Sequence, residues 1–172
     1  MEGIDFPPYL IEKIFPPKEC INLVDTNDDG LSDSIQIQAI NWVLPFTIPE
    51  TIDLGDFNLE TTDLSSMIQI MIDSEPLEIY DMKYLRENAR FFFKGNNFTF
   101  NSILDGTLAG QTVAVGDKLT ILLKLKEADT KKLEESKGKH EIIINIKSLP
   151  TLTIKYELFE KNMNIKFDPS KT

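Results

Sequence analysis

The stretch that decides the fold is Lys118-Leu119-Thr120-Ile121-Leu122-Leu123-Lys124-Leu125. Apolar residues occupy every second position from 119 onward, and most positions between them are polar. Because successive side chains of a β-strand point to opposite faces, this period of two predicts a strand with one face on the core and the other toward solvent. The side chains expected to face the core are those of Leu119, Ile121, Leu123 and Leu125.

The same alternation recurs on both sides of that stretch. It is found in residues 34–40, 68–72, 98–102, 142–146, 152–158 and 163–167, with turn signals such as Pro76, Asp105-Gly106 and Pro150 between them. Roughly nine to eleven such strands predict an all-β fold, built as an antiparallel β-sandwich. An immunoglobulin-like module needs only about 100 residues. A chain of 172 residues therefore suits a jelly roll or an enlarged immunoglobulin-like sandwich.

Two segments depart from simple alternation. In residues 34–46 the alternation changes phase, so we expect a β-bulge near Ala39-Ile40 and a continuing strand with Ile40, Trp42, Leu44 and Phe46 on one face. Residues 126–139 contain good helix formers but almost no apolar face. We expect them to form a mobile, charged excursion between two strands rather than a packed helix.

Prolines set the expected domain organisation. Residues 1–20 contain Pro7, Pro8, Pro16 and Pro17, which limit any helix between them to a turn or two. We interpret residues 1–20 as a short N-terminal arm and residues 21–172 as a single β-sandwich domain. No apolar run approaches the roughly 18 residues that a membrane helix needs, and no secretory signal peptide is visible at the start.

The charge is unevenly spread along this acidic chain. The formal net charge is −10; residues 1–90 carry 18 acidic and 5 basic side chains, whereas residues 91–172 carry 10 and 13. Nucleic-acid binding is disfavoured, because a groove that follows phosphates needs clustered Lys and Arg. The asymmetry either serves solubility or marks a subunit whose acidic part docks onto the lysine-rich part of a neighbour, a contact that gives rings or filaments.

No catalytic motif is recognisable. The chain has one cysteine, Cys20, and one histidine, His140, and it lacks a glycine-rich phosphate loop. We expect Cys20 to be a small buried residue, and we predict no catalytic residues and no enzyme activity. A small hydrolase that uses Asp and Glu pairs stays an alternative, because the separation of carboxyl groups cannot be read from sequence.

The clearest chemical motif is Asp25-Thr26-Asn27-Asp28-Asp29-Gly30-Leu31-Ser32-Asp33. Oxygen-bearing side chains stand at relative positions 1, 3, 5 and 9 and a glycine at position 6, which is the ligand order of a calcium loop. The expected metal ligands are Asp25, Asn27, Asp29, the carbonyl of Leu31, and Asp33. The alternative is an acidic hairpin turn built on Asp29-Gly30.

This loop resembles the DxNxDGxxD calcium loops of dockerins, thrombospondin type 3 repeats and integrin-type β-propeller blades. Its flanks, residues 21–24 and 34–38, have strand character, and its twelfth position is Gln36 rather than the Glu of an EF-hand. The likeness is therefore closest to the propeller-type loop, which joins two strands. The resemblance implies a structural calcium site that fixes one hairpin.

Together these observations predict a non-enzymatic structural or assembly subunit, such as a virion, tail or surface-filament component, with a calcium-stabilised hairpin. Its expected partners are copies of itself or other structural subunits, and its expected location is a virion or an extracellular surface. The alternative is a calcium-dependent module that binds carbohydrate or a cell surface. Trp42, Tyr80, Tyr84 and the run Phe91–Phe93 would offer a sugar-stacking platform if their rings faced outward.

Overall fold

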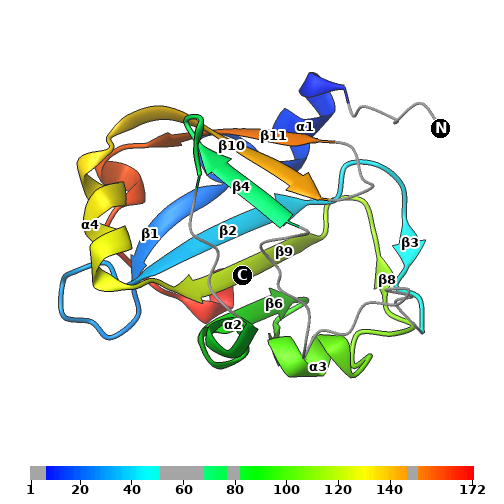
Figure 1. Ribbon diagram of the computed structural model, residues 1–172. Coiled ribbons are helices and arrows are strands. Elements are labelled where there is room, and N and C mark those ends of the chain that lie inside the picture. Colours follow the sequence, from blue (N-terminus) through cyan, green and yellow to red (C-terminus); the bar gives the residue numbers. More distant parts are fainter. Residues whose placement is uncertain (1–6, 51–67, 77–81, 147–150) are drawn as a thin grey trace.

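A computed structural model describes residues 7–50, 68–76, 82–146 and 151–172 of the chain (Figure 1). Within these residues, twelve strands lie in three sheets and are accompanied by four α-helices. The predicted β-rich and mainly antiparallel character is confirmed. The all-β prediction is met in part. Strands predominate, but helices occupy residues 100–104, which were expected to be strand, and residues 127–135, which were expected to be irregular chain.

The largest sheet has six strands in the order β12-β1-β2-β9-β6-β7. They are β1 (Ile21–Asp25), β2 (Ser34–Ile40), β6 (Ala89–Phe93), β7 (Asn96–Thr99), β9 (Lys118–Lys124) and β12 (Ile165–Lys166). Neighbouring strands are antiparallel except for β1 and β12, which run parallel. The stretch with the clearest alternation, β9, lies inside this sheet between β2 and β6.

The second sheet has four strands in the order β11-β10-β4-β5, and the third pairs β3 with β8. These strands are β3 (Phe46–Thr47), β4 (Ile68–Ile72), β5 (Glu75–Pro76), β8 (Thr112–Val113), β10 (Gly138–Ile146) and β11 (Leu152–Leu158). In the second sheet β10 is the longest strand; it pairs with β11 from Gly138 to Ile144 and with β4 from Ile142 to Ile146. The turn between β4 and β5 is consequently held close to the middle of β10.

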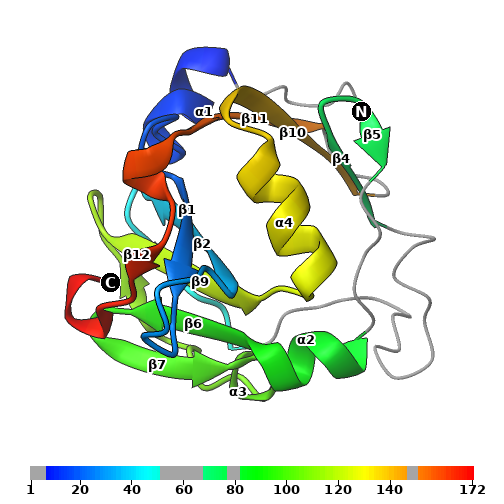
Figure 2. The ribbon, with the colours of Figure 1, turned by 90° about the vertical axis from the view of Figure 1, so that its left-hand side faces the viewer.

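Among the residues described, four α-helices accompany the sheets. They are α1 (Pro8–Ile14), α2 (Met82–Asn88), α3 (Phe100–Leu104) and α4 (Glu127–Glu135), with short 3₁₀ turns at Glu160–Asn162 and Pro169–Lys171. The short helix α1 confirms the turn or two expected between the proline pairs. Figure 2 shows α4 between the four-stranded sheet and the part of the six-stranded sheet that adjoins α2.

The main core lies between the two larger sheets. Its buried side chains come from the start of β1 and from β10 and β11: Cys20, Ile21, Leu23, Ile142, Ile154, Tyr156 and Leu158. Leu133 of α4 and Phe15, which follows α1, also pack against this cluster. The prediction of an excursion at 126–139 rather than a packed helix is therefore wrong, since α4 forms there and Leu133 packs against the core.

Both faces of β9 are covered, whereas one was expected to face solvent. Leu119 packs in the cluster of Phe93, Phe98 and Leu108 on one side. On the other side Leu122 is buried with Val24 and Phe92, under Ile165 and Phe167. The C-terminal segment supplies this second cover, because it crosses the face and places the ring of Phe167 5.3 Å from that of Phe92.

The predicted bulge near Ala39-Ile40 is wrong. Strand β2 pairs with β9 without interruption, from Ser34 opposite Lys124 to Ile40 opposite Lys118. Beyond Ile40 the chain leaves the sheet as a loop, which Asn41 fastens by donating from Nδ2 to the carbonyls of Leu44, Val113 and Ala114. Trp42, Leu44 and Phe46 therefore do not continue a strand face with Ile40, and their side chains are exposed.

A second strand prediction fails at residues 98–102. Strand β7 ends at Thr99, whose hydroxyl accepts the N–H of Ser102 at 3.1 Å and caps the short helix α3. This capping box outweighs the alternation of Phe98, Phe100 and Ser102. The long connection predicted at 47–65 and the ring of Tyr80 lie largely or wholly outside the described residues.

Candidate functional site

The first candidate site is the hairpin loop of residues 25–33, which joins β1 to β2. Asp25 is buried, with 4% of its surface exposed. Its Oδ1 accepts the N–H groups of Asn27, Asp28 and Asp29 at 3.2, 2.7 and 3.3 Å, and its Oδ2 accepts that of Gly30 at 2.7 Å. Gly30 has φ +87°, a conformation that favours glycine. One carboxylate thus organises the whole turn.

The electrostatics of Asp25 follow from these contacts. Burial alone would raise the pKa of its carboxyl group, but the four N–H donors outweigh burial and hold the pKa below its usual range. A carboxylate that accepts several backbone N–H groups is stabilised in its charged form. Asp25 therefore carries a negative charge inside the turn at neutral pH.

The C-terminal segment fastens this loop from outside. Asn164 Oδ1 accepts both the N–H and the hydroxyl of Ser32, at 2.8 and 2.7 Å, and Lys166 Nζ lies 2.8 Å from Asp28 Oδ2. The N–H of Phe167 donates to the carbonyl of Asp25 at 3.1 Å. The loop consequently connects β1 with β12, which are neighbours in the six-stranded sheet although they come from opposite ends of the chain.

The expected metal ligands meet only in part. Asn27 and Asp29 are side by side, because Asn27 Nδ2 donates to Asp29 Oδ2 at 3.0 Å, while Asp29 Oδ1 accepts the N–H of Leu31. Asp33 turns elsewhere and accepts the hydroxyls of Thr26 and Ser34, at 2.6 and 2.8 Å. Among the described residues no three Asp, Glu, His or Cys side chains are gathered as metal ligands. The donor types fit calcium, but their present arrangement serves the turn.

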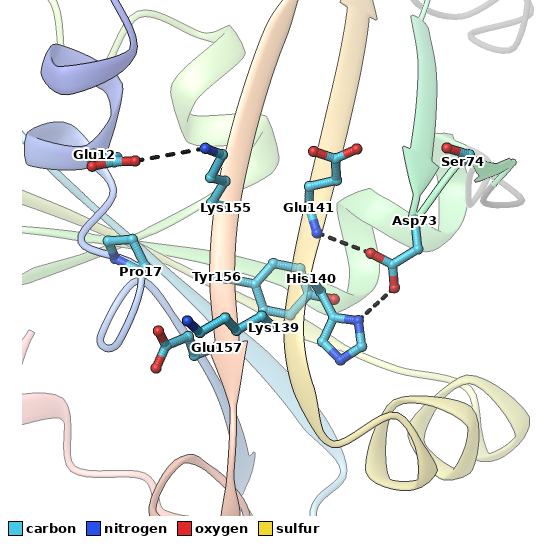
Figure 3. A pocket seen from close by; sticks show the side chains of 10 residues that line it. All are labelled: Glu12, Pro17, Asp73, Ser74, Lys139, His140, Glu141, Lys155, Tyr156 and Glu157. Atoms are coloured by element: carbon cyan, nitrogen blue, oxygen red, sulfur yellow. Dashed lines mark hydrogen bonds and ion pairs between the residues drawn. The ribbon is translucent and has the colours of Figure 1, made fainter.

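A second candidate site, which sequence reasoning missed, joins His140 to Asp73 (Figure 3). His140 lies on β10 and its side chain is 11% exposed. Its Nδ1 is 2.5 Å from Asp73 Oδ2, and its Nε2 faces the carbonyl of Ser136 at the C-terminal end of α4. The ring also lies 5.3 Å from that of Tyr156, its cross-strand partner on β11.

Asp73 is held in turn by β10. Its Oδ1 accepts the N–H of Glu141, and its own N–H donates to the carbonyl of Glu141, each at 3.0 Å. Asp73 and Ser74 form the two-residue turn between β4 and β5 with φ +51° and +69°, values that are costly for residues other than glycine, asparagine and aspartate. Burial would raise the pKa of Asp73, but the hydrogen bonds from His140 and Glu141 and the charge of His140 lower it below its usual range.

A shallow hollow of about 590 Å³ lies over this region of β10 and β11. Its lining carries both signs of charge: Glu12, Asp73, Glu141 and Glu157 with Lys139, His140 and Lys155. Glu12 and Lys155 are paired at 4.0 Å. The His140 ring lies on the opposite face of β10 from Lys139 and Glu141, and both its nitrogens are engaged, so it does not offer a free base to a substrate in this hollow.

Cys20 is buried in the core, as expected. Its Sγ faces the carbonyl of Lys155 at 3.9 Å, and burial raises the pKa of its thiol to about 11.

The sequence signal for the true partner of His140 was weak: an Asp-Ser pair between two short strands, 67 residues from the histidine. Only the pairing of β4 with β10 brings the two together.

The third candidate site is an exposed apolar surface, here called the apolar ridge. It consists of Trp42, Val43, Leu44, Phe46 and Val115, which are 46, 47, 70, 53 and 48% exposed. The two parts of the ridge adjoin, since Phe46 pairs with Val113 and the N–H of Gly116 donates to the carbonyl of Asn41 at 2.7 Å. Exposed apolar side chains on adjacent loops make this surface a candidate for contact with a partner.

No known protein family matches this chain, and no curated protein is similar to it in sequence. In the described part of the chain no helix is long and apolar enough to cross a membrane.

Proposed function

We propose that this protein is a non-enzymatic assembly subunit that associates with copies of itself through the apolar ridge. The observation that carries the proposal is the exposure of four large apolar side chains within five consecutive residues, 42–46. Single exposed apolar residues are common on soluble proteins, whereas contiguous patches mark interaction surfaces. Trp and Phe are also enriched at the centres of protein interfaces.

The fold supports a structural role. Two larger sheets that share one core are typical of a β-sandwich, the architecture of many shell and filament subunits. We propose a jelly-roll or enlarged immunoglobulin-like sandwich with added helices, as part of a virion, a tail or a surface filament.

Sedimentation velocity over a range of protein concentrations tests the proposal. We expect the wild-type chain to form larger species as its concentration rises. Leu44→Ser should weaken this association roughly 10- to 100-fold, the equivalent of one buried leucine side chain. Leu31→Ser is the matched control, because Leu31 is similarly exposed, at 66%, but lies in the loop at the opposite end of β2. A wild-type chain that stays monomeric at every concentration would contradict the proposal.

We also propose that the 25–33 loop binds calcium as a structural clip. Asp25, Asn27, Asp29, the Leu31 carbonyl and Asp33 would hold the ion, which would supply positive charge in an acidic part of the chain. The spacing of the donors and the bond from Gly30 to Asp25 support this proposal. The contacts of Asp33 with Thr26 and Ser34 would have to open before this carboxylate could reach the ion.

Thermal melting with calcium and with a chelator tests the clip. Calcium at 100 times its dissociation constant should stabilise the protein by about 2.7 kcal/mol, which raises Tm by several degrees. Asp29→Ala should abolish that rise, whereas Asp105→Ala, at an exposed carboxylate elsewhere, should leave it intact. A wild-type Tm that does not respond to calcium would leave the acidic turn as the correct interpretation of the motif.

Carbohydrate binding at the ridge is the second candidate function. The exposed rings of Trp42 and Phe46 could stack on sugar faces. The loop and Trp42 lie at opposite ends of the seven-residue strand β2, about 20 Å apart at 3.3 Å per residue. Sugar binding at the ridge should therefore not depend on calcium. A glycan array that is silent for wild type, with and without calcium, would exclude this candidate.

A further inference from the structure

We propose that His140 is a pH-sensitive clasp that, in its protonated form, ties the β4–β5 turn and the end of α4 to strand β10. The inference is independent of the proposed assembly. It rests on the two atoms that face the imidazole ring: a carboxylate oxygen of Asp73 and the carbonyl oxygen of Ser136. Both are acceptors, so each requires an N–H from the ring.

Only the imidazolium form satisfies both contacts. A neutral imidazole carries one N–H and one bare nitrogen, and the bare nitrogen would face an oxygen lone pair. The imidazolium form also places positive charge beside the Asp73 carboxylate and at the C-terminal end of α4, where the helix dipole favours a cation. Deprotonation of the ring therefore loses one of the two contacts.

The groups that neighbour the ring each keep one protonation state around neutral pH. Burial, followed by the charge of Asp73, raises the pKa of the stacked Tyr156, so its hydroxyl stays neutral. The Cys20 thiol, which lies in the same core cluster as Tyr156, stays protonated, with a pKa of about 11. Asp73 stays charged because its pKa lies below the usual range. The remaining charged groups around the hollow are Glu12, Lys139, Glu141, Lys155 and Glu157.

These remaining groups do not share the face of the ring. Along β10 and β11 the core side chains Ile142, Ile154 and Leu158 alternate with the charged ones. Lys139 and Glu141 adjoin His140 on the same strand and so point to the opposite face. Asp73 is the charged group that meets the ring directly.

The clasp closes over a strained element. Ser74 has a φ of +69°, a conformation that is costly for serine and that persists only where surrounding contacts hold it. Two bonds to Glu141 and one to His140 hold the turn on β10. Next to the turn, Glu75 Oε2 of β5 lies 3.3 Å from Lys132 Nζ of α4, a contact that does not involve the ring. The clasp should be closed from mildly acidic pH, where Asp73 is charged, up to the pH at which imidazole loses its proton, and open above it.

The experiment uses the untagged chain, in which His140 is the one histidine. Long-range ¹H–¹⁵N NMR spectra at pH 6 should show both ring nitrogens protonated. Amide exchange of Asp73 and Glu141, corrected for its intrinsic pH dependence, should accelerate on the order of tenfold between pH 6 and pH 8.5, as expected for a lost hydrogen bond to a charged group. A bare ring nitrogen at pH 6 would overturn the proposal without any variant.

Two variants and a control complete the test. His140→Gln and Asp73→Asn should each abolish the pH-dependent change in exchange, and asparagine tolerates the positive φ at position 73. Glu157→Gln removes a titratable group from the same hollow and should keep the wild-type response. A pH response that persists in His140→Gln would assign the change to another group and refute the clasp. If His140→Gln fails to fold, Asp73→Asn and the wild-type ring spectra still decide the outcome.

Discussion

At the scale of single residues, Asp25 shows how one carboxylate can determine a turn. Its two oxygens accept N–H groups from four consecutive residues, 27–30. Asp and Asn commonly bond to the backbone two residues on, and here the bonding continues through position 30. The spacing of acidic residues that suggested a metal loop also suits a turn held by its own side chains. In both cases the carboxylate at the first position must point into the loop, toward either a metal ion or the backbone N–H groups.

Asp25→Asn should destabilise the protein at neutral pH and reduce its sensitivity to acid. An amide NH₂ in place of Oδ2 would face the N–H of Gly30, donor against donor. Because the pKa of Asp25 is lowered on folding, its contribution is present above the unfolded pKa of about 3.9 and is lost as pH falls through the lower folded value.

Thermal melts between pH 7 and pH 2.5 would measure this effect. At pH 7 the variant should melt several degrees below wild type, and the difference should shrink as pH falls below about 4. Asp105→Asn, at an exposed carboxyl group, should follow the wild-type curve. A constant difference at every pH would show that the charge of Asp25 does not contribute to stability.

The sequence predicted the position of Asp25 and the turn glycine, but not what fastens the loop. Ser32 and Asn164 are 132 residues apart, and nothing in the local spacing of either indicates the other. The contact between Asp73 and His140 could not be predicted for the same reason, because the two residues are 67 positions apart. Local patterns predict which groups a loop offers, whereas strand pairing decides which distant groups receive them.

At the scale of elements, the prediction for residues 126–139 differs most from the structure, because α4 forms there. Its sequence is almost wholly polar, and the hydrophobic pattern that usually marks a packed helix is missing. Thr130 is nevertheless buried, and Leu133 packs on the main core. The helix forms because good helix formers, acidic residues in its first turn and an Lys131–Glu127 pair at 2.7 Å support it locally.

Leu133→Ala should therefore destabilise the protein by about 1–2 kcal/mol, since it removes the apolar contact between α4 and the core. Chemical denaturation would measure the loss. Glu135→Ala, an exposed position in the same helix, should change stability by less than about 0.5 kcal/mol. Equal effects of the two substitutions would indicate that α4 is held by its own helix propensity rather than by packing.

At the scale of the whole molecule, the alternation of apolar residues predicted the strands better than the layers. Residues 118–124, 142–146 and 152–158 are strands, as their period of two indicated. The pattern could not reveal that the C-terminal segment would cross the far face of β9 and bury Leu122. Nor could it show that residues 41–45 would leave the sheet, because an apolar segment has the same sequence pattern whether it is buried in a core or exposed on the surface.

The pairing of β1 with β12 has a consequence for how the chain is made. One edge of the six-stranded sheet joins residues 24–25 to residues 165–166. A ribosome releases β1 long before β12 has been synthesised, so the loop at 25–33 must wait for Asn164 and Lys166 to receive its outer contacts. Long-range pairing of this kind slows folding. Until that edge closes, the nascent chain presents an unpaired strand and an uncovered apolar face, the features on which chaperones and neighbouring nascent chains act.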